Sequence, residues 1–465
     1  MGKKIRMITA LLLCCAMVFS ITACAQEDPV PPNTAPQLPG YMPEDPLELW
    51  ARLNETMDAL SSIEMTINTQ KVYYSDGHQY RQHTESYVLS THDAHYTESE
   101  SSLFCQPLNL EQTINMVEAF YDGKMYRAVS DGTHSQKFYS EMSHEDYDGL
   151  QTGGLTAELA LVDCTTAAFS KTADNGWQLD FSGYTKKTID QAMENLGLTE
   201  SAMGSPVTDM QVSVTANEDF YVTKMEISFD FAGAGESAPV FTVSTQYNAW
   251  NTAVFDATKL NAEEYTQVED VYLLDAIAAA IQDRQNAFLG QFTLETKTVE
   301  QFQNQTRTSE EKGVMIYGLQ NNAYCYFFTA NTEGKSFIVR YQNGEQTVIS
   351  NGQSYTADKT EAEAKAYING LIDSAHYKPL AITSIEKRSD GSYLLISEHP
   401  EVSDYVQGIE TTFARQEIIV TFADGKLTQI ESRLEIEGRF EEDTISIQTE
   451  SSVMFTEIEE FPNIE

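Results

Sequence analysis

The chain has 465 residues, with 70 acidic and 29 basic side chains and a formal net charge of −41. A surface this acidic repels nucleic acid, which argues against DNA or RNA as a partner. Hydrophobic residues make up 41% of the chain, enough to build cores and exclude global disorder, and the length predicts more than one domain.

Residues 1–23 have the layout of a secretory signal peptide. Lys3, Lys4 and Arg6 precede an uncharged apolar stretch from Met7 to Ile21. That stretch is shorter than the roughly 20 apolar residues that cross a bilayer, so we expect it to be removed rather than to stay as a membrane helix.

The signal ends in Ile21-Thr22-Ala23-Cys24, which resembles the lipobox of bacterial lipoproteins. The resemblance implies cleavage before Cys24, lipidation of its sulfur, and anchoring at the extracytoplasmic face of the cell membrane. Two acyl chains suffice for stable anchoring. Cleavage would change the net charge from 29 − 70 = −41 to 26 − 70 = −44. An ordinary secretory signal with an incidental cysteine is the alternative.

Residues 24–46 are predicted to form a tether. They contain seven of the 13 prolines and four acids, but no Lys or Arg. Such a composition favours extended polyproline conformations at about 3.1 Å per residue over a packed core.

A first folded unit is predicted over residues 47–257. Asp45-Pro46-Leu47-Glu48 is typical of a helix start, with an N-cap, a proline at the first position and an acid three residues after the cap. The apolar residues that follow at helical spacing are Leu49, Leu53, Met57 and Leu60. Behind them Ile63, Met65 and Ile67 alternate with polar residues, which predicts a strand with one buried face.

A second unit over residues 258–465 repeats this order. Leu273, Ile277 and Ile281 mark a helix, and Phe292 and Leu294 open a strand behind it. Other landmarks also recur: Asp122-Gly123 is matched with Asn351-Gly352, and Val214-Thr215 with Val420-Thr421. We interpret the recurrence as a tandem duplication, with the polar segment Asn251–Asp270 as the junction.

The later parts of both units are strongly patterned. Apolar residues alternate with polar ones from Met225 to Phe231 and from Ile430 to Phe455, which is typical of antiparallel sheets with one face in water. Asp-Gly and Asn-Gly pairs between these strands suit hairpin turns with positive φ.

Two segments carry a family resemblance. An acylatable cysteine, a polar linker and a helix ending in "DALSSIEMTINTQ", with "AAAIQDRQNAFLGQFTLETKT" in the second unit, look like lipoproteins of the LolA/LppX-like fold. The resemblance implies an α+β fold of two tandem units, each a curved antiparallel β-sheet wrapped over an N-terminal α-helix as a half-barrel. The space between sheet and helix would hold acyl chains. The ligand-binding candidates are then the helix residues Leu49, Leu53, Met57, Leu60, Leu273, Ile277 and Ile281, for which core packing is the alternative.

Residue groups suited to catalysis or metal binding are few. His78, His83, His92 and His95, with Asp93, could bind zinc, but their polar neighbours favour an exposed sheet face. Ser384 and Lys387 have the Ser-x-x-Lys spacing of acyl-enzymes, but a strand there would point them to opposite faces. We predict no metal, no cofactor and no enzymatic activity.

Three cysteines remain after removal of the signal and lipidation of Cys24. Of these, only Cys105 and Cys164 are a plausible disulfide pair, and buried single thiols are favoured, also for Cys325. Cys325 lies in the aromatic run Tyr324–Phe328, which we interpret as a buried strand rather than a pocket wall.

These observations predict a lipid-anchored extracytoplasmic protein that binds a hydrophobic or amphiphilic, lipid-like ligand. A closed-core acidic module that contacts another envelope protein or acts in sensing is the alternative. An extracellular hydrolase is a third and weaker hypothesis, because no nucleophile or metal set is found.

Overall fold

The structure is a computed structural model that describes residues 43–75, 78–150, 164–196, 198, 203, 205–232, 239–303, 305–320, 323–332, 335–372, 378–398, 400, 410–440, 443–458 and 461. The predicted signal peptide, Cys24 and nearly all of the predicted tether lie outside these residues. The chain forms two compact units, which divide between Gln267 and Val268.

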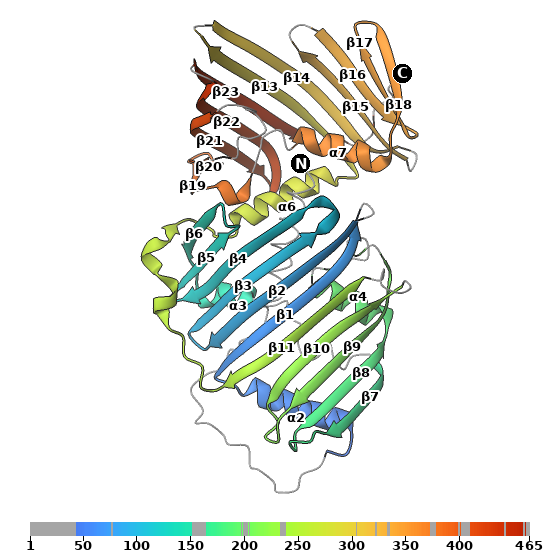
Figure 1. Cartoon of the computed structure of the whole chain (residues 1–465), viewed down its shortest axis with the longest axis vertical. Helices are drawn as coiled ribbons and strands as arrows, with labels where there is room; N and C mark the ends of the chain where they lie inside the picture. The colour runs from blue at the N-terminus through green and yellow to red at the C-terminus, as the bar shows by residue number, and fades with distance from the viewer. Residues whose placement is uncertain are drawn as a thin grey trace. The chain divides into compact units, whose positions relative to one another are not determined.

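The first unit is built on a sheet of twelve strands. They are β1 (Ser62–Ser75), β2 (His78–Thr91), β3 (Ala94–Cys105), β4 (Leu110–Tyr121), β5 (Lys124–Ser130), β6 (Ser135–Glu141), β7 (Cys164–Lys171), β8 (Trp177–Tyr184), β9 (Val207–Ala216), β10 (Val222–Phe231), β11 (Val240–Trp250) and β12 (Thr266–Gln267). Their order is β12-β6-β5-β4-β3-β2-β1-β11-β10-β9-β8-β7 (Figure 1). The short β12 runs parallel to β6, whereas the other pairings are antiparallel.

Helices α2 (Pro46–Asp58) and α3 (His144–Leu150) pack on one face of this sheet, here called its helix face; α4 (Lys186–Asn195) follows β8. The Trp50 ring of α2 lies 5.8 Å from that of Phe181 on β8, and Tyr147 of α3 stacks 4.3 Å from Phe120 on β4. The predicted N-cap is confirmed, since the Asp45 carboxylate accepts a hydrogen bond from the Glu48 amide at 2.8 Å.

Residues 251–267 cover part of the opposite face. This segment includes the short 3₁₀ helices η5 (Ala257–Leu260) and η6 (Ala262–Glu264), and a further one, η2 (Gln106–Leu108), links β3 to β4. Leu260 and Phe255 pack against Tyr96 and Tyr126 in one apolar cluster. The sequence placed a polar junction here; in the structure these residues belong to the first unit, because their few apolar side chains cover its aromatic ones.

The second unit is built on a sheet of eleven strands. They are β13 (Leu289–Phe302), β14 (Gln305–Gln320), β15 (Ala323–Thr332), β16 (Lys335–Gln342), β17 (Glu345–Ser350), β18 (Gln353–Asp358), β19 (Ser384–Lys387), β20 (Tyr393–Ser397), β21 (Glu410–Ala423), β22 (Lys426–Phe440) and β23 (Asp443–Thr456). Its helices are α6 (Leu273–Gln285), α7 (Glu361–Ile372) and η8 (Pro379–Ala381). The order β18-β17-β16-β15-β14-β13-β23-β22-β21-β20-β19 repeats that of the first sheet, with β13 in the place of β1.

The predicted fold class is wrong. Two large, almost wholly antiparallel sheets of 12 and 11 strands with few helices make the protein mainly β, not an α+β pair of LolA/LppX-like half-barrels wrapped over helices. The reason is one of scale. A helix of 13 residues such as α2 or α6 is about 20 Å long, whereas twelve strands spaced about 4.8 Å apart span over 50 Å.

One landmark of the predicted duplication is also misaligned. By strand order, the turn Asp122-Gly123 between β4 and β5 corresponds to Asn343-Gly344 between β16 and β17, not to Asn351-Gly352. All three turns hold both residues at positive φ, so turn chemistry cannot tell one hairpin from the next. Val214-Thr215 and Val420-Thr421 do lie on corresponding strands, β9 and β21.

Candidate functional site: a polar band on the first sheet

The seven predicted ligand-binding residues lie on or next to α2 and α6. Leu49, Leu53 and Ile277 are 0% exposed, Leu273 and Ile281 are buried, and Met57 and Leu60 are half-buried. The helix stripes therefore contribute mainly to the cores of their own units, and a role in ligand binding stays a prediction.

The histidine group does not assemble. His92 and Asp93 are exposed and pair at 4.0 Å, and His83 is exposed on β2. His95 instead is buried, where its Nε2 lies 3.0 Å from Thr97 Oγ1. Burial lowers the pKa of His95 to about 4, because the protonated ring would lose its hydration. Among the described residues no group of His, Cys, Asp or Glu is placed to hold a metal ion.

The other candidates are structural. Ser384 and Lys387 lie on strand β19, as predicted, and Lys387 pairs with Glu269. Cys105 and Cys164 are not bonded to each other; Cys105 and Cys325 are buried, and burial raises the pKa of Cys325.

The first sheet instead buries an unpredicted set of polar side chains on its helix face. We call this set the polar band. Its members are Lys71, Gln82, Thr84, Ser86, His95, Thr97, Ser99, Ser101, Glu118, Arg127 and Gln136, each at most 9% exposed. They come from β1 to β6, where they share a face with Met65, Ile67 and Val88.

Hydroxyl groups form the centre of the polar band. Strand register places Thr84 opposite Ser101 and Ser86 opposite Ser99. The Thr84 and Ser101 hydroxyls are 2.8 Å apart, and Ser86 donates to Ser99 at 3.2 Å. Gln82 donates a further bond to Ser101 at 3.4 Å. A buried polar group without a hydrogen-bond partner is destabilising. These hydrogen bonds therefore allow the sheet to bury the hydroxyl and amide groups.

An ion pair lies at one side of the polar band. Arg127 Nε is 3.2 Å from Glu118 Oε1, and the two side chains are 7% and 9% exposed. The residues sit opposite each other on β5 and β4. Removal of either partner would leave the other charge buried.

The second unit keeps polar residues at some positions of the polar band and replaces others. Three residues separate the helix from the first strand in each unit, 59–61 in the first and 286–288 in the second. This matches β1 with β13 residue by residue, and the strand register extends the match to the neighbouring strands. Gly313 and Ala330 then replace Ser86 and Ser99, with the Phe328 ring 2.5 Å from where a Gly313 Cβ would lie.

The buried ion pair has no counterpart either. By the same correspondence, Val339 and Val348 replace Glu118 and Arg127, opposite each other on β16 and β17. The Ser86–Ser99 pair and the buried ion pair are therefore not required by the strand order that the two sheets share.

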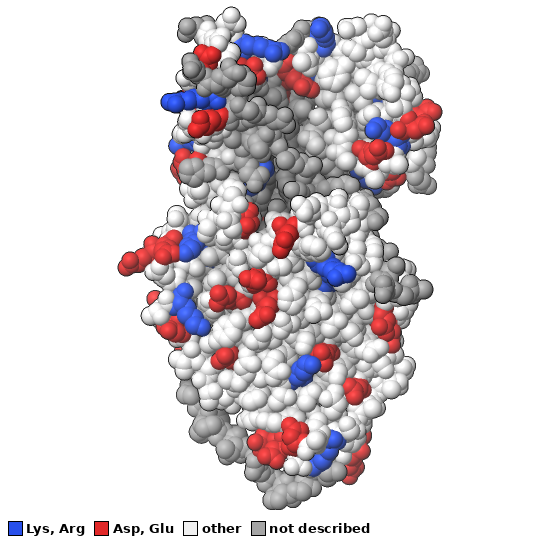
Figure 2. Space-filling view, in the orientation of Figure 1, with Lys and Arg blue, Asp and Glu red and all other residues white. Residues whose placement is uncertain are grey.

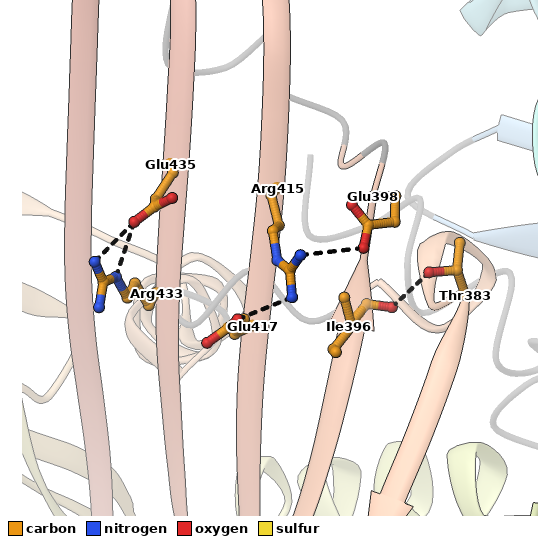
Figure 3. Close-up of polar contacts among 7 residues, drawn as sticks. All are labelled: Thr383, Ile396, Glu398, Arg415, Glu417, Arg433 and Glu435. Atoms are coloured by element: carbon orange, nitrogen blue, oxygen red, sulfur yellow. Dashed lines mark hydrogen bonds and ion pairs between the residues drawn. The ribbon is translucent and has the colours of Figure 1, made fainter.

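The second sheet carries a row of paired charges on the face opposite its helices. Arg433 bonds Glu435, and Arg415 contacts both Glu417 and Glu398 (Figure 3). Across five strands, register aligns a row of alternating charge, Glu417, Arg433, Glu450, Lys297 and Glu310. Figure 2 also shows acidic and basic side chains interspersed on the face in view. Such exposed pairs contribute at most about 1 kcal/mol each.

The polar band is not predictable from composition alone, because Ser, Thr and Gln are mostly exposed in proteins. A usable signal was present in β2, where Gln82, Thr84 and Ser86 alternate with Arg81, His83 and Glu85. Uncharged polar residues on one face and charged residues on the other indicate that the uncharged face is the drier one.

In the described part of the chain, no helix is both long and apolar enough to span a membrane. No family model matches the chain, and no curated protein is significantly similar to it in sequence.

Solved structures give only weak likenesses. A DUF1329 family protein from Desulfovibrio piger is 10% identical, with 39% of this chain and 89% of that chain covered and a TM-score of 0.18. A candidate AttH from Nitrosomonas europaea is 6% identical, with 84% and 92% covered and a TM-score of 0.14. A candidate outer membrane protein from Bacteroides fragilis is 6% identical, with 85% and 98% covered and a TM-score of 0.19. At such low TM-scores these likenesses carry no argument about function.

Proposed function

We propose that the protein is an extracytoplasmic lipoprotein of the cell envelope, tethered through lipid on Cys24, that binds an amphiphilic ligand without enzymatic activity. The observation that carries the proposal is the polar band, buried on the helix face of the first sheet, with its Ser86–Ser99 pair and its ion pair replaced by glycine and apolar residues in the second.

An amphiphile suits this face because polar and apolar sectors adjoin on it. Toward the start of β1, Met65 is 0% exposed and Ile67 4%, and Val88 opposite Met65 is 0% exposed. An acyl chain gains about 25 cal/mol per Å² of apolar surface that it removes from water. A polar head would exchange its hydration for hydrogen bonds with the hydroxyls of the polar band.

The full burial of Leu49, Leu53 and Ile277 supports a second candidate function. If both cores are closed, the protein would act through its outer surface, as a module that contacts another envelope protein.

Native mass spectrometry tests the choice. The Cys24→Ala protein, which we expect to be released into the medium, would be purified without detergent. An added mass of one amphiphile that disappears on denaturation supports ligand binding. The mass of the protein alone in every preparation contradicts it and favours the closed-core module.

A matched pair of variants locates the ligand. Ser99→Val removes a hydroxyl from the polar band, whereas Ser102→Val changes the opposite face of the same strand. The first should lose most of the bound amphiphile and the second should keep it. Equal retention in both variants would place the ligand elsewhere.

The anchor has its own test. Cys24→Ala should move the protein from the membrane fraction to the medium, because the sulfur is the predicted attachment point of the lipid. Unchanged membrane retention would contradict the anchoring and leave the binding experiment unaffected, since that can then be run on protein released from membranes.

A further inference from the structure

Lys71 is a buried cation on the helix face of the first sheet. Its side chain belongs to a residue only 8% exposed, on β1 beyond Met65 and Ile67. Its ammonium lies 4.9 Å from the centre of the Tyr73 ring. Within the described part of the chain, no carboxylate forms an ion pair with it. A ring face compensates only part of the hydration that a buried ammonium gives up.

Among the residues that the structure describes, the surroundings of Lys71 supply hydrogen bonds but no unmatched negative charge. Register places it between Gln82 on β2 and Phe241 on β11. Next along the same face come Thr84 and Ser101, joined at 2.8 Å. The acid of the polar band, Glu118, is already matched by Arg127 at 3.2 Å. Within the described residues, this part of the polar band therefore carries one unbalanced positive charge beside several hydrogen-bonding side chains.

The fold does not need a cation at this position. The corresponding residue of the second unit is Thr298, whose hydroxyl is 3.2 Å from that of Thr449 on the neighbouring strand. A hydroxyl at this position is satisfied within its own sheet, whereas the Lys71 ammonium, among the described residues, lies against the Tyr73 ring. The difference points to a ligand of the first unit rather than to a requirement of the sheet.

We infer that the helix face of the first unit binds an amphiphile with an anionic head, a carboxylate or a phosphate. Lys71 supplies the counter-charge, and Gln82, Thr84 and Ser101 supply hydrogen bonds. The tail extends toward Met65, about 20 Å away at a strand rise of about 3.3 Å per residue. This inference rests on the proposed function and names its ligand class.

Three probes of equal chain length isolate the contribution of the head. Dodecanoate and dodecyl phosphate carry a negative charge, and dodecanol does not. Affinities are measured by displacement of a fluorescent naphthylamine from the full-length Cys24→Ala protein. The two anions should bind at least about tenfold more tightly than dodecanol, and their ratio tells which head is preferred.

Lys71 variants then assign the preference. Lys71→Met should weaken anion binding about tenfold and leave dodecanol unchanged, whereas Lys71→Arg should keep the preference. The control Lys224→Met removes a cation from the opposite face, paired with Glu226 at 2.8 Å, and should change neither affinity. Folding is checked by unfolding in urea, where ligand-free Lys71→Met should be at least as stable as the parent.

The possible failures are distinguishable. Equal affinity for all three probes, or a preference that survives Lys71→Met, overturns the role of Lys71 and leaves amphiphile binding intact. If no probe binds and no amphiphile is retained on purification, both the preference for an anionic head and the proposed amphiphile binding are contradicted.

Discussion

Position by position, the helix face of the first sheet carries Ser86, Ser99 and Glu118 where that of the second carries Gly313, Ala330 and Val339. The strand order is the same, so backbone hydrogen bonding can be kept while these three side chains change from polar to glycine or apolar ones. The second sheet fills the space with the Phe328 ring beside Gly313, whereas the first fills it with paired hydroxyls. The second unit thus serves as an internal control for the first.

The largest expected effect concerns the buried ion pair. Arg127→Met should lower the free energy of unfolding of the first unit by about 3–5 kcal/mol, because Glu118 would stay buried without its partner. All three tryptophans (Trp50, Trp177 and Trp250) lie in this unit, so tryptophan fluorescence during urea unfolding reports on it alone.

The matching change on the second sheet is Arg433→Met, which breaks an exposed pair and should cost no more than about 1 kcal/mol by circular dichroism. The double variant Glu118→Leu with Arg127→Met should recover much of the loss. If Arg127→Met costs no more than Arg433→Met, the pair is not buried as described.

The second effect is a pH dependence specific to the first unit. Burial depresses the pKa of His95 from 6.5 to about 4, so the unfolded chain takes up the proton first. Stability from this residue is therefore complete above about pH 6.5, is lost as the pH falls toward 4, and amounts to about 3 kcal/mol.

His95→Gln, which can still bond Thr97, should remove that part of the acid sensitivity in tryptophan-detected unfolding at pH 7 and 4.5. The control His92→Gln changes an exposed ring and should leave the profile unchanged. A profile that is the same for both variants would mean that the His95 ring is hydrated.

Local features were predictable from sequence because they depend on neighbours along the chain. The Asp45 cap, the alternation of Ile63, Met65 and Ile67, and the Asn-Gly turns each follow from a few consecutive residues. The size of the sheets was not, since strand pairing joins residues far apart, such as Met65 with Tyr247. The apolar faces of α2 and α6 therefore predicted a larger share of helix in the fold than the structure has.

The candidate site was harder to predict for a related reason. Ser99 and Ser102 lie three positions apart on one strand, yet Ser99 is 2% exposed and Ser102 is half-buried on the opposite face. What covers a strand is decided by helices and loops elsewhere in the chain. His95 shows the same limit, because its sequence neighbourhood is polar whereas its contact in space is Tyr147 of α3.

A smaller effect probes the apolar filling of the second sheet. Gly313→Ala would place a methyl group 2.5 Å from the Phe328 ring and should cost about 1–3 kcal/mol, measured by circular dichroism. Gly370→Ala on α7 is the control, since no atom lies within 4 Å and alanine favours the helix, so this variant should gain up to about 1 kcal/mol. Similar signs for the two changes would contradict the packing.

The smallest expected effect separates structure from function within the polar band. Ser86→Ala removes one donor to Ser99 and should cost only about 1 kcal/mol, because alanine itself is easily buried and the Ser99 oxygen loses only one accepted hydrogen bond. A purely structural band predicts nothing more. An amphiphile site predicts in addition that ligand retention falls by more than this stability loss can explain, while Ser102→Ala leaves retention unchanged. Comparison of the two losses in one variant therefore decides whether the hydroxyls hold the sheet or its ligand.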